Sequence, residues 1–417
     1  MKIAALFAAV TVVAALPAAA AAQTDPAPDE PLKISKERIG KALNGVLERG
    51  EAMGLVARVY QDGEKVYEAA FGEADLEANE SMAQDTLFRI YSMTKPITGV
   101  ALMTLYEQGL FDLDDPITDY VPEFEDVRVF EGLDEDGEPI LVAPERMPTV
   151  RDFTRHTAGL GGGDIGGYPQ RAYEEAGVRD MDITLEEEVR RLASVPLAYQ
   201  PGTQWHYSDA VEVQALMVER LSGMPFDAYV QKTILDPLDM KDTGYVVPEE
   251  DRDRLAEVYT FEDGELVPAT GEASLAFNLS EHALTPGSWG LVSTIRDYSR
   301  FARMLLGEGT FEEVTILKPE TVELMATDAL PDGLTDTHFL PNKGQVGFGI
   351  DFAVRTAPPA SPDENVGAIG EFTWDGYAST LFWVDPANDL TALIFYQIVP
   401  FDDTPQKAFR KAVYGAD

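Results

Sequence analysis

The sequence predicts an α/β or α+β fold that is built from both ends of the chain and carries a mostly helical insertion. Near the N-terminus, apolar runs at residues 54–60 and 65–71 flank Asp62-Gly63, a pair typical of a tight β-hairpin turn. Strand patterns return from residue 347 onward, and between these regions the apolar residues recur mostly at helical spacing. We therefore expect the two ends of the chain to share one domain and the middle to form another.

Helices are predicted where apolar residues keep to one face. Ile39, Leu43 and Val46 have this spacing within residues 34–47. A second helix is predicted at residues 92–108, with Pro96 near its start, where a missing N–H does no harm. Further helices are expected at residues 149–156, 185–192, 209–221, 226–234, 296–306, 321–326 and 408–413.

Strands and hairpins complete the predicted order. The acidic stretch at residues 124–148 contains Asp136-Gly137 and is interpreted as an inserted hairpin or flap. Residues 259–268, around Asp263-Gly264, predict another hairpin. Strands are expected at residues 347–354, 372–374, 380–384 and 390–398.

The N-terminus has the pattern of a secretory signal peptide. Residues 1–22 combine a short basic start, an apolar run and an alanine-rich cleavage site, and residues 23–33 form a linker rich in proline and acid. A membrane anchor is the alternative, but the apolar run is short for spanning. We therefore expect an exported protein, periplasmic or secreted, without a stable membrane anchor. Residues 34–120 and 290–417 are predicted to form a discontinuous α/β domain around an inserted helical domain, residues 121–289.

Composition excludes several classes of function. The chain of 417 residues has no cysteine, which rules out disulfide frameworks, thiol nucleophiles, zinc fingers and iron–sulfur clusters. Four histidines argue against a histidine-rich metal site. The formal net charge of −41 repels phosphate backbones and anionic lipid, so nucleic acid is not an expected partner.

Three short segments could carry chemistry. In the first, Ser92-Met93-Thr94-Lys95, a serine at a helix start has a lysine one turn later on the same face. An amine desolvated in such a pocket can act as a base for the serine hydroxyl. This is the S-x-x-K arrangement of penicillin-recognising serine enzymes, although the pattern alone is also that of an ordinary helix cap with a solvated lysine.

The other two segments lie far from the first in the chain. In the second, Tyr207 precedes a helix that Ser208 or Asp209 can cap, and a phenol near an ammonium group can transfer protons. In the third, residues 371–377, a strand ends in Trp374-Asp375-Gly376-Tyr377. Backbone N–H groups of Ser92 and Tyr377 could together form an oxyanion hole. Taken singly, a core tyrosine and a plain Asp-Gly turn explain these segments as well.

The order of the motifs is more specific than any one of them. The chain resembles the serine β-lactamase-related family, which includes class C β-lactamases, low-molecular-weight D-Ala-D-Ala peptidases and family eight carboxylesterases. The resemblance runs from about residue 34 to the C-terminus. The segments that carry it are residues 89–119 (with SMTK and LxxQGLxxLDDP), 149–160 (TVRDFTRHTAGL), 199–209 (YQPGTQWHYSD), 237–245 (PLDMKDTGY), 290–298, 374–376 and 385–386.

The resemblance implies a β-lactamase/transpeptidase-like fold, an antiparallel sheet flanked by helices plus the inserted helical domain, with the site between the domains. It implies that Ser92 is the acylated nucleophile, that Lys95 takes or relays its proton, and that Tyr207 is a second base and the acid for the leaving group. Backbone N–H groups of Ser92 and Tyr377 would form the oxyanion hole. No metal or cofactor is expected for two successive acyl transfers.

Two departures from the family pattern concern the substrate. Asp209 stands where the lactamases and peptidases usually have asparagine, and a carboxylate there would favour a protonated Lys95. Trp374 stands where those enzymes usually carry the cation that binds a substrate carboxylate, and Asp375 adds negative charge. With Gly376, this Trp-x-Gly pattern resembles the carboxylesterase branch. We therefore expect Asp209, Trp374, Asp375 and Gly376 to contact a small neutral ester or amide.

The same motifs fit other functions. A β-lactamase or D-Ala-D-Ala carboxypeptidase fits the same motifs, and a binding protein that lost its chemistry is possible on the same fold. His156 or His206 could serve a Ser-His-Asp triad, but the chain lacks the G-x-S-x-G elbow of such hydrolases. The motifs favour a serine hydrolase that forms an acyl-enzyme on Ser92 and acts as a carboxylesterase or amidase.

Overall fold

The computed structural model describes residues 32–162, 165–271, 273–334 and 336–416. The predicted signal peptide and most of the predicted linker lie outside the described residues, so export stays a prediction. Within the described ranges, no helix has the length and apolar character needed to cross a bilayer.

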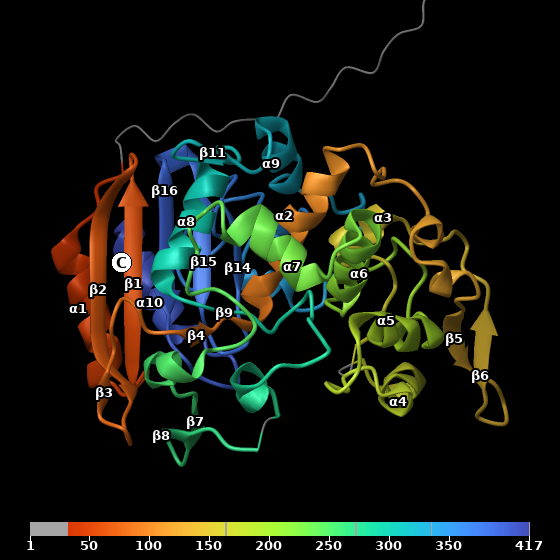
Figure 1. Cartoon of the computed structure of the whole chain (residues 1–417), viewed down its shortest axis with the longest axis horizontal. Helices are drawn as coiled ribbons and strands as arrows, with labels where there is room; N and C mark the ends of the chain where they lie inside the picture. The colour runs from red at the N-terminus through yellow and green to blue at the C-terminus, as the bar shows by residue number, and fades with distance from the viewer. Residues whose placement is uncertain (1–31, 163–164, 272, 335, 417) are drawn as a thin grey trace, which may run out of the picture.

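An eight-stranded sheet joins the two ends of the chain. Its order is β12-β13-β14-β15-β16-β1-β2-β3, and every neighbouring pair is antiparallel. Strand β16, near the C-terminus, pairs directly with β1, as Figure 1 shows. The strands are β1 (Gly54–Gln61), β2 (Glu64–Asp75), β3 (Glu80–Ser81), β12 (Val346–Phe348), β13 (Ala353–Arg355), β14 (Phe372–Asp375), β15 (Leu381–Asp385) and β16 (Leu390–Phe395).

Helices cover both faces of the sheet. Helices α1 (Lys36–Glu48) and α10 (Thr404–Tyr414) pack together on one face, and α8 (Ile295–Leu306) packs on the other. Alternate residues of β1 belong to different cores: Leu55 joins the cluster of α1 and α10, whereas Val56 joins the cluster that contains α8. Because successive side chains of a strand point to opposite faces, β1 is buried on both sides.

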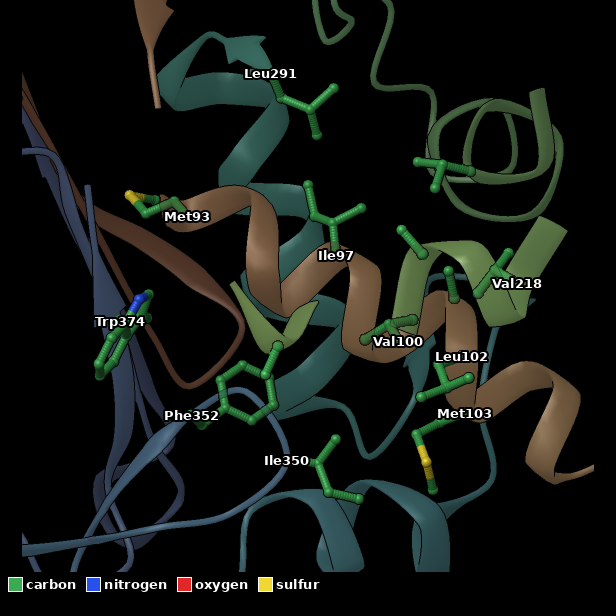
Figure 2. Packing of buried hydrophobic residues seen from close by; sticks show 14 of the residues in the cluster. Met93, Ile97, Val100, Leu102, Met103, Val218, Leu291, Ile350, Phe352 and Trp374 are labelled. Atoms are coloured by element: carbon green, nitrogen blue, oxygen red, sulfur yellow. The ribbon is translucent and has the colours of Figure 1, made fainter. Parts of the chain in front are cut away.

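The middle of the chain is mostly helical and lies to one side of the sheet (Figure 1). Helix α2 connects the two parts, because it packs against α6 as well as against the sheet domain. In Figure 2, Ile97 and Val100 of α2 lie among buried residues that include Val218 of α6. The helices are α2 (Thr94–Tyr106), α3 (Val150–Thr154), α4 (Gly167–Ala176), α5 (Leu185–Ser194), α6 (Ala210–Ser222) and α7 (Phe226–Val230).

Smaller elements connect these layers. The predicted hairpins are confirmed: one protrudes at the far edge of the helical part and the other lies below the sheet (Figure 1). Strand pair β4–β9 leads into the segment of Ser92. The elements are β4 (Phe88–Arg89), β5 (Val129–Leu133), β6 (Pro139–Val142), β7 (Tyr259–Glu262), β8 (Glu265–Pro268), β9 (Val292–Ser293), β10 (Thr310–Phe311), β11 (Val314–Thr315) and α9 (Pro319–Met325).

Several predicted elements differ from the structure. The prediction of a single strand at residues 347–354 is wrong, because the chain reverses between β12 and β13, where Asp351 has a positive φ of 57°. Helix α4 was not predicted. The helix expected at 226–234 is α-helical only to Val230 and continues as a π-turn at Gln231–Leu235. The proposed boundaries at residues 120/121 and 289/290 stay predictions.

Candidate active site

Ser92 lies at the junction between the sheet and α2. It is part of a 3-10 turn, Tyr91–Met93, which leads directly into α2, so the expected helix start is tighter than an ordinary α-turn. Tyr91 has a positive φ of 42°, a conformation rare for a bulky residue and common next to functional groups. The turn is held from below, because the Tyr298 hydroxyl donates to the Met93 carbonyl over 2.8 Å.

Lys95 reaches back to Ser92 from the first turn of α2. Its side chain is almost fully buried, and Nζ donates to Ser92 Oγ over 3.3 Å and to the Ser288 carbonyl over 2.9 Å. The same Nζ lies 4.6 Å from the centre of the Tyr207 ring. The structure thus brings together the hydroxyl, the amine and the phenol that lie far apart in the sequence.

A buried glutamate, Glu212, holds the turn whose Ser288 carbonyl accepts the hydrogen bond from Lys95. Glu212 of α6 accepts hydrogen bonds from the backbone N–H groups of Gly287 and Ser288, over 2.5 and 3.1 Å, and from the Ser288 hydroxyl. Burial raises the pKa of Glu212 to about 7, the Ser288 bond opposes the rise, and the charge of Asp209 adds to it. Glu212 therefore positions the Ser288 carbonyl opposite Lys95.

The loop before α6 positions Tyr207. The His206 N–H donates to the His156 carbonyl over 3.0 Å, and the Ser208 N–H donates to His156 Nδ1 over 3.3 Å. The Tyr207 ring packs 4.8 Å from the His156 ring and 5.3 Å from the Trp374 ring, and Trp374 Nε1 donates to its hydroxyl over 3.3 Å. Tyr207 is only partly buried, and it lines a cavity.

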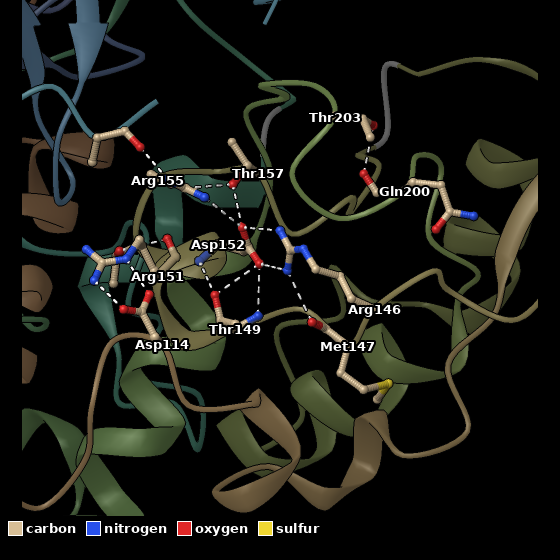
Figure 3. Close-up of polar contacts among 12 residues, drawn as sticks. Asp114, Arg146, Met147, Thr149, Arg151, Asp152, Arg155, Thr157, Gln200 and Thr203 are labelled. Atoms are coloured by element: carbon tan, nitrogen blue, oxygen red, sulfur yellow. Dashed lines mark hydrogen bonds and ion pairs between the residues drawn. The ribbon is translucent and has the colours of Figure 1, made fainter. Parts of the chain in front are cut away.

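An ion cluster around Asp152 holds residues 149–157, the segment that contains His156 (Figure 3). Asp152 of α3 is fully buried and pairs with Arg146 and Arg155, and its carboxylate also accepts from the Thr149 and Thr157 hydroxyls. Burial alone would raise the pKa of Asp152, but the Arg146 bond, the Thr149 N–H and the nearby arginine charges lower it below its ordinary value. The cluster keeps residues 149–157 in place beneath the Tyr207 loop.

Strand β14 supplies the opposite wall. It ends in Asp375, and Gly376 follows at a point where only glycine fits, because a Cβ there would lie 2.4 Å from the Ile90 carbonyl oxygen and 2.5 Å from Thr380 Oγ1. This close approach brings the backbone that follows β14 next to the turn of Ser92. The Tyr377 ring meets the Tyr91 ring edge to face at 5.7 Å.

A cavity of about 320 Å³ opens between these walls. Ser92 and Tyr207 line it together with the last two residues of β14 and the two that follow them, Trp374, Asp375, Gly376 and Tyr377. Sequence reasoning missed the remaining lining residues, which are Phe339, Asn342, Lys343, Phe401 and Asp403. They come from a short 3-10 helix, Leu340–Lys343, and from connecting segments, none of which has a recognisable periodicity, so their position could not be predicted from a local pattern.

Lys343 is the most consequential residue among those missed. Its Nζ forms an ion pair with the Asp375 carboxylate, and both side chains are nearly buried, at 13% and 12% exposure. The ammonium group also lies 4.5 Å from the centre of the Phe401 ring and 5.5 Å from that of Trp374. The negative charge that the sequence places at Asp375 is therefore compensated within the cavity wall.

Asp209 has a different neighbour from the one expected. Its carboxylate accepts a hydrogen bond from the Tyr173 hydroxyl of α4, and Arg179 Nε donates to that hydroxyl over 3.1 Å. Asp209 occupies the N-cap position of α6 without making a side-chain cap bond. Substrate binding by Asp209 stays a prediction, and the structure assigns this carboxylate to the link between α4 and α6.

The histidine alternative fits the structure poorly. His156 is fully buried, and burial, followed by the charges of Lys95 and His206, lowers its pKa well below the ordinary value. Its imidazole packs against Trp205, Tyr207 and Phe348. His156 thus supports the Tyr207 loop.

Comparison with known proteins identifies the family and the fold that this chain shares. A family model described as Beta-lactamase matches residues 39–416. Protein Rv1367c of Mycobacterium tuberculosis is 34% identical over 366 residues, covering 86% of this chain and 89% of the relative. Esterase EstB of Burkholderia gladioli is 31% identical over 373 residues, with the same two coverages. The solved structure of EstCE1, described as a hydrolase with promiscuous acyltransferase activity, superposes with a TM-score of 0.76 at 24% identity, covering 91% of this chain and 98% of EstCE1.

Proposed function

The chain belongs to the beta-lactamase family of serine hydrolases, and on that premise we propose that it is a carboxylesterase or amidase for small neutral substrates, acting through an acyl-enzyme on Ser92. The observation that carries the proposal is the meeting of Ser92, Lys95 and Tyr207 beside one cavity whose wall is aromatic and whose Asp375 charge is compensated by Lys343. The fold confirms the predicted β-lactamase/transpeptidase-like class.

The proposed reaction has two acyl transfers. Ser92 Oγ attacks the ester carbonyl while its proton passes to Lys95 or Tyr207, and the backbone N–H groups of Ser92 and Tyr377 stabilise the developing oxyanion. The carbon–oxygen bond to the alcohol then breaks, and Tyr207 donates a proton to the leaving oxygen. Water attacks the acyl-enzyme in the same way, and the carboxylic acid and the Ser92 hydroxyl are released.

The cavity favours a neutral substrate over a β-lactam or a peptide with a free carboxylate. Trp374 occupies the position at which the lactamases and peptidases usually carry a cation. The cation that the structure does place in the wall, Lys343, already has Asp375 as its partner. An anionic substrate therefore lacks the charge-assisted pair on which its binding would depend. The name of the relative EstB, an esterase, supports the same choice.

Covalent labelling tests the nucleophile. After incubation with a fluorophosphonate probe, intact mass should show one adduct on the wild-type protein and none on Ser92→Ala. The wild-type enzyme should turn over p-nitrophenyl acetate with a higher kcat/KM than nitrocefin. An adduct that persists in Ser92→Ala would contradict the assignment of the nucleophile, and faster turnover of nitrocefin would favour the β-lactamase alternative.

Export of the mature chain is proposed on the N-terminal pattern alone and is testable by N-terminal sequencing of the secreted protein.

A further inference from the structure

A second cavity adjoins the one beside Ser92. Its volume is about 700 Å³, compared with about 320 Å³ for the inner cavity. Asn342, Phe401 and Asp403 line both cavities, so the two meet at these residues. Phe261 and Pro400 extend the apolar lining outward. Neither the sequence motifs nor the reacting groups require this outer cavity.

Exposed aromatic side chains follow the path from the inner to the outer cavity. Tyr377 lines the inner cavity and is 42% exposed, Phe401 lines both and is 36% exposed, and Phe261 lines the outer one and is 41% exposed. Large aromatic side chains left in water beside a cavity are a cost in the free protein that a bound apolar group removes. Their succession indicates a binding surface that continues away from Ser92.

The charges of the outer cavity limit what can bind there. Asp402, Asp403 and Lys407 line it, so the acids outnumber the base by one. Lys407 pairs with Asp403 over 2.9 Å, and Asp402 accepts from the Thr404 N–H over 2.8 Å. With one carboxylate left uncompensated by a cation in the lining, an anionic group is disfavoured and an uncharged one is accepted.

The hairpin that carries Phe261 is fixed at its base. The Tyr259 N–H donates to the Gln397 carbonyl over 3.0 Å, and the Val399 N–H donates to the Tyr259 carbonyl over 2.9 Å. These bonds tie β7 to the chain that continues from β16 toward Phe401. Phe261 itself lies two residues further along the hairpin, where it is exposed, so its removal leaves the anchoring bonds intact.

The two cavities differ in how they suit the two halves of an ester. The acyl group becomes bonded to Ser92 and therefore stays in the inner cavity, next to Tyr207 and Trp374. The alcohol has to depart after acylation and be replaced by water, so it belongs on the side that is open to solvent. We propose that the outer cavity, from Phe401 to Phe261, binds the alcohol part of the substrate and selects extended, uncharged, aromatic or alicyclic alcohols. This inference rests on the proposed esterase activity.

Acetate esters that share one acyl group isolate the alcohol side. The test compares kcat/KM for biphenyl-4-yl acetate with kcat/KM for p-nitrophenyl acetate, so that the acyl-enzyme is identical. In Phe261→Ala the ratio of the first to the second should fall about fivefold to tenfold, as expected for loss of an aromatic contact. Leu133→Ala is the matched control: Leu133 is 52% exposed on the remote β5–β6 hairpin, and its loss should leave the ratio unchanged.

The outcomes distinguish failure of the proposed alcohol site from failure of the proposed esterase activity. A ratio that is unchanged in Phe261→Ala, in an enzyme that hydrolyses p-nitrophenyl acetate through Ser92, overturns the alcohol site alone. If Phe261→Ala instead selectively lowers kcat/KM for p-nitrophenyl octanoate, the outer cavity takes the acyl group and the proposal is wrong. Absence of Ser92-dependent hydrolysis of any of these esters in the wild-type protein contradicts the proposed function itself.

Discussion

Replacing Asp375 by asparagine should make the enzyme more receptive to anionic substrates. Asp375→Asn removes the carboxylate that pairs with Lys343 and leaves the ammonium group in the cavity wall without its counter-charge. Asparagine has nearly the same size, so the β14 backbone and Gly376 can stay in place. Lys343 also keeps its contacts with the rings of Phe401 and Trp374.

The magnitude follows from the burial of the pair. Both side chains are nearly buried, at 13% and 12% exposure. With an effective dielectric constant of about 20, two unit charges roughly 5 Å apart interact by about 3 kcal/mol. Relaxation of the lysine and entry of water reduce this figure, so a gain of about 1–2 kcal/mol for an anionic substrate is expected, which corresponds to roughly fivefold to thirtyfold in kcat/KM.

The assay is the ratio of kcat/KM for nitrocefin to that for p-nitrophenyl acetate. The ratio should rise in Asp375→Asn, and the rise should shrink as salt is added, because mobile ions screen the attraction between the uncompensated Lys343 and the anionic substrate. Asp126→Asn, an exposed acid in the helical half, changes the net charge equally and should leave the ratio unchanged. A ratio that does not move in Asp375→Asn, or that moves as much in Asp126→Asn, refutes the role given to the ion pair.

Two further predictions concern the support of the site. Asp152→Ala should lower the free energy of unfolding in urea by about 3–5 kcal/mol, because it leaves Arg146 and Arg155 without their carboxylate partner beside a buried gap. The control Asp114→Ala should cost less than about 1 kcal/mol, since the Asp114 side chain is 71% exposed. Equal losses in the two variants would contradict the importance of the cluster. Glu212 has a pKa raised to about 7 by burial, so its contribution to stability is present below its ordinary pKa of 4.5 and is lost as the pH rises toward 7. In Glu212→Gln the melting temperature should no longer decline across that window, and an unchanged decline would show that other groups cause it.

Much of the fold could be predicted because each main element has its own periodicity. The β1–β2 hairpin, the helix after Ser92 and the C-terminal strands follow directly from apolar spacing and Asp-Gly turns. The failures occur where local spacing is ambiguous. The run Gly347-Phe348-Gly349-Ile350 continues into Phe352 and looks like one buried strand, yet Asp351 takes a left-handed conformation and reverses the chain. This turn depends on tertiary packing, which the spacing of apolar residues does not indicate.

The residues of the candidate site likewise include some that local motifs predict and some that they do not. Ser92, Lys95 and Tyr207 could be predicted because S-x-x-K and the Tyr207 segment are short motifs in a characteristic order, and the structure brings them together. The role of Glu212 could not be predicted, because a glutamate on a helix normally faces solvent. Only its hydrogen bonds to the backbone of Gly287 and Ser288 show that it holds this turn. A buried polar partner across seventy-odd residues leaves no local pattern.

The charge of Asp375 shows why the missing long-range partners matter for function. From the sequence, its carboxylate should repel an anionic substrate. In the structure, Lys343 lies 32 positions earlier, at the end of a short 3-10 helix, and its pairing with Asp375 cancels that charge, so the wall neither attracts nor repels an anion strongly. The proposed preference for neutral esters then follows from the lack of an available cation. Removal of Asp375 would free a cation that is already in the wall, whereas removal of Lys343 would leave an uncompensated carboxylate and strengthen the bias against anions. Selectivity in this cavity is therefore a property of the Lys343–Asp375 pair, and a comparison of related sequences should consider the two positions together.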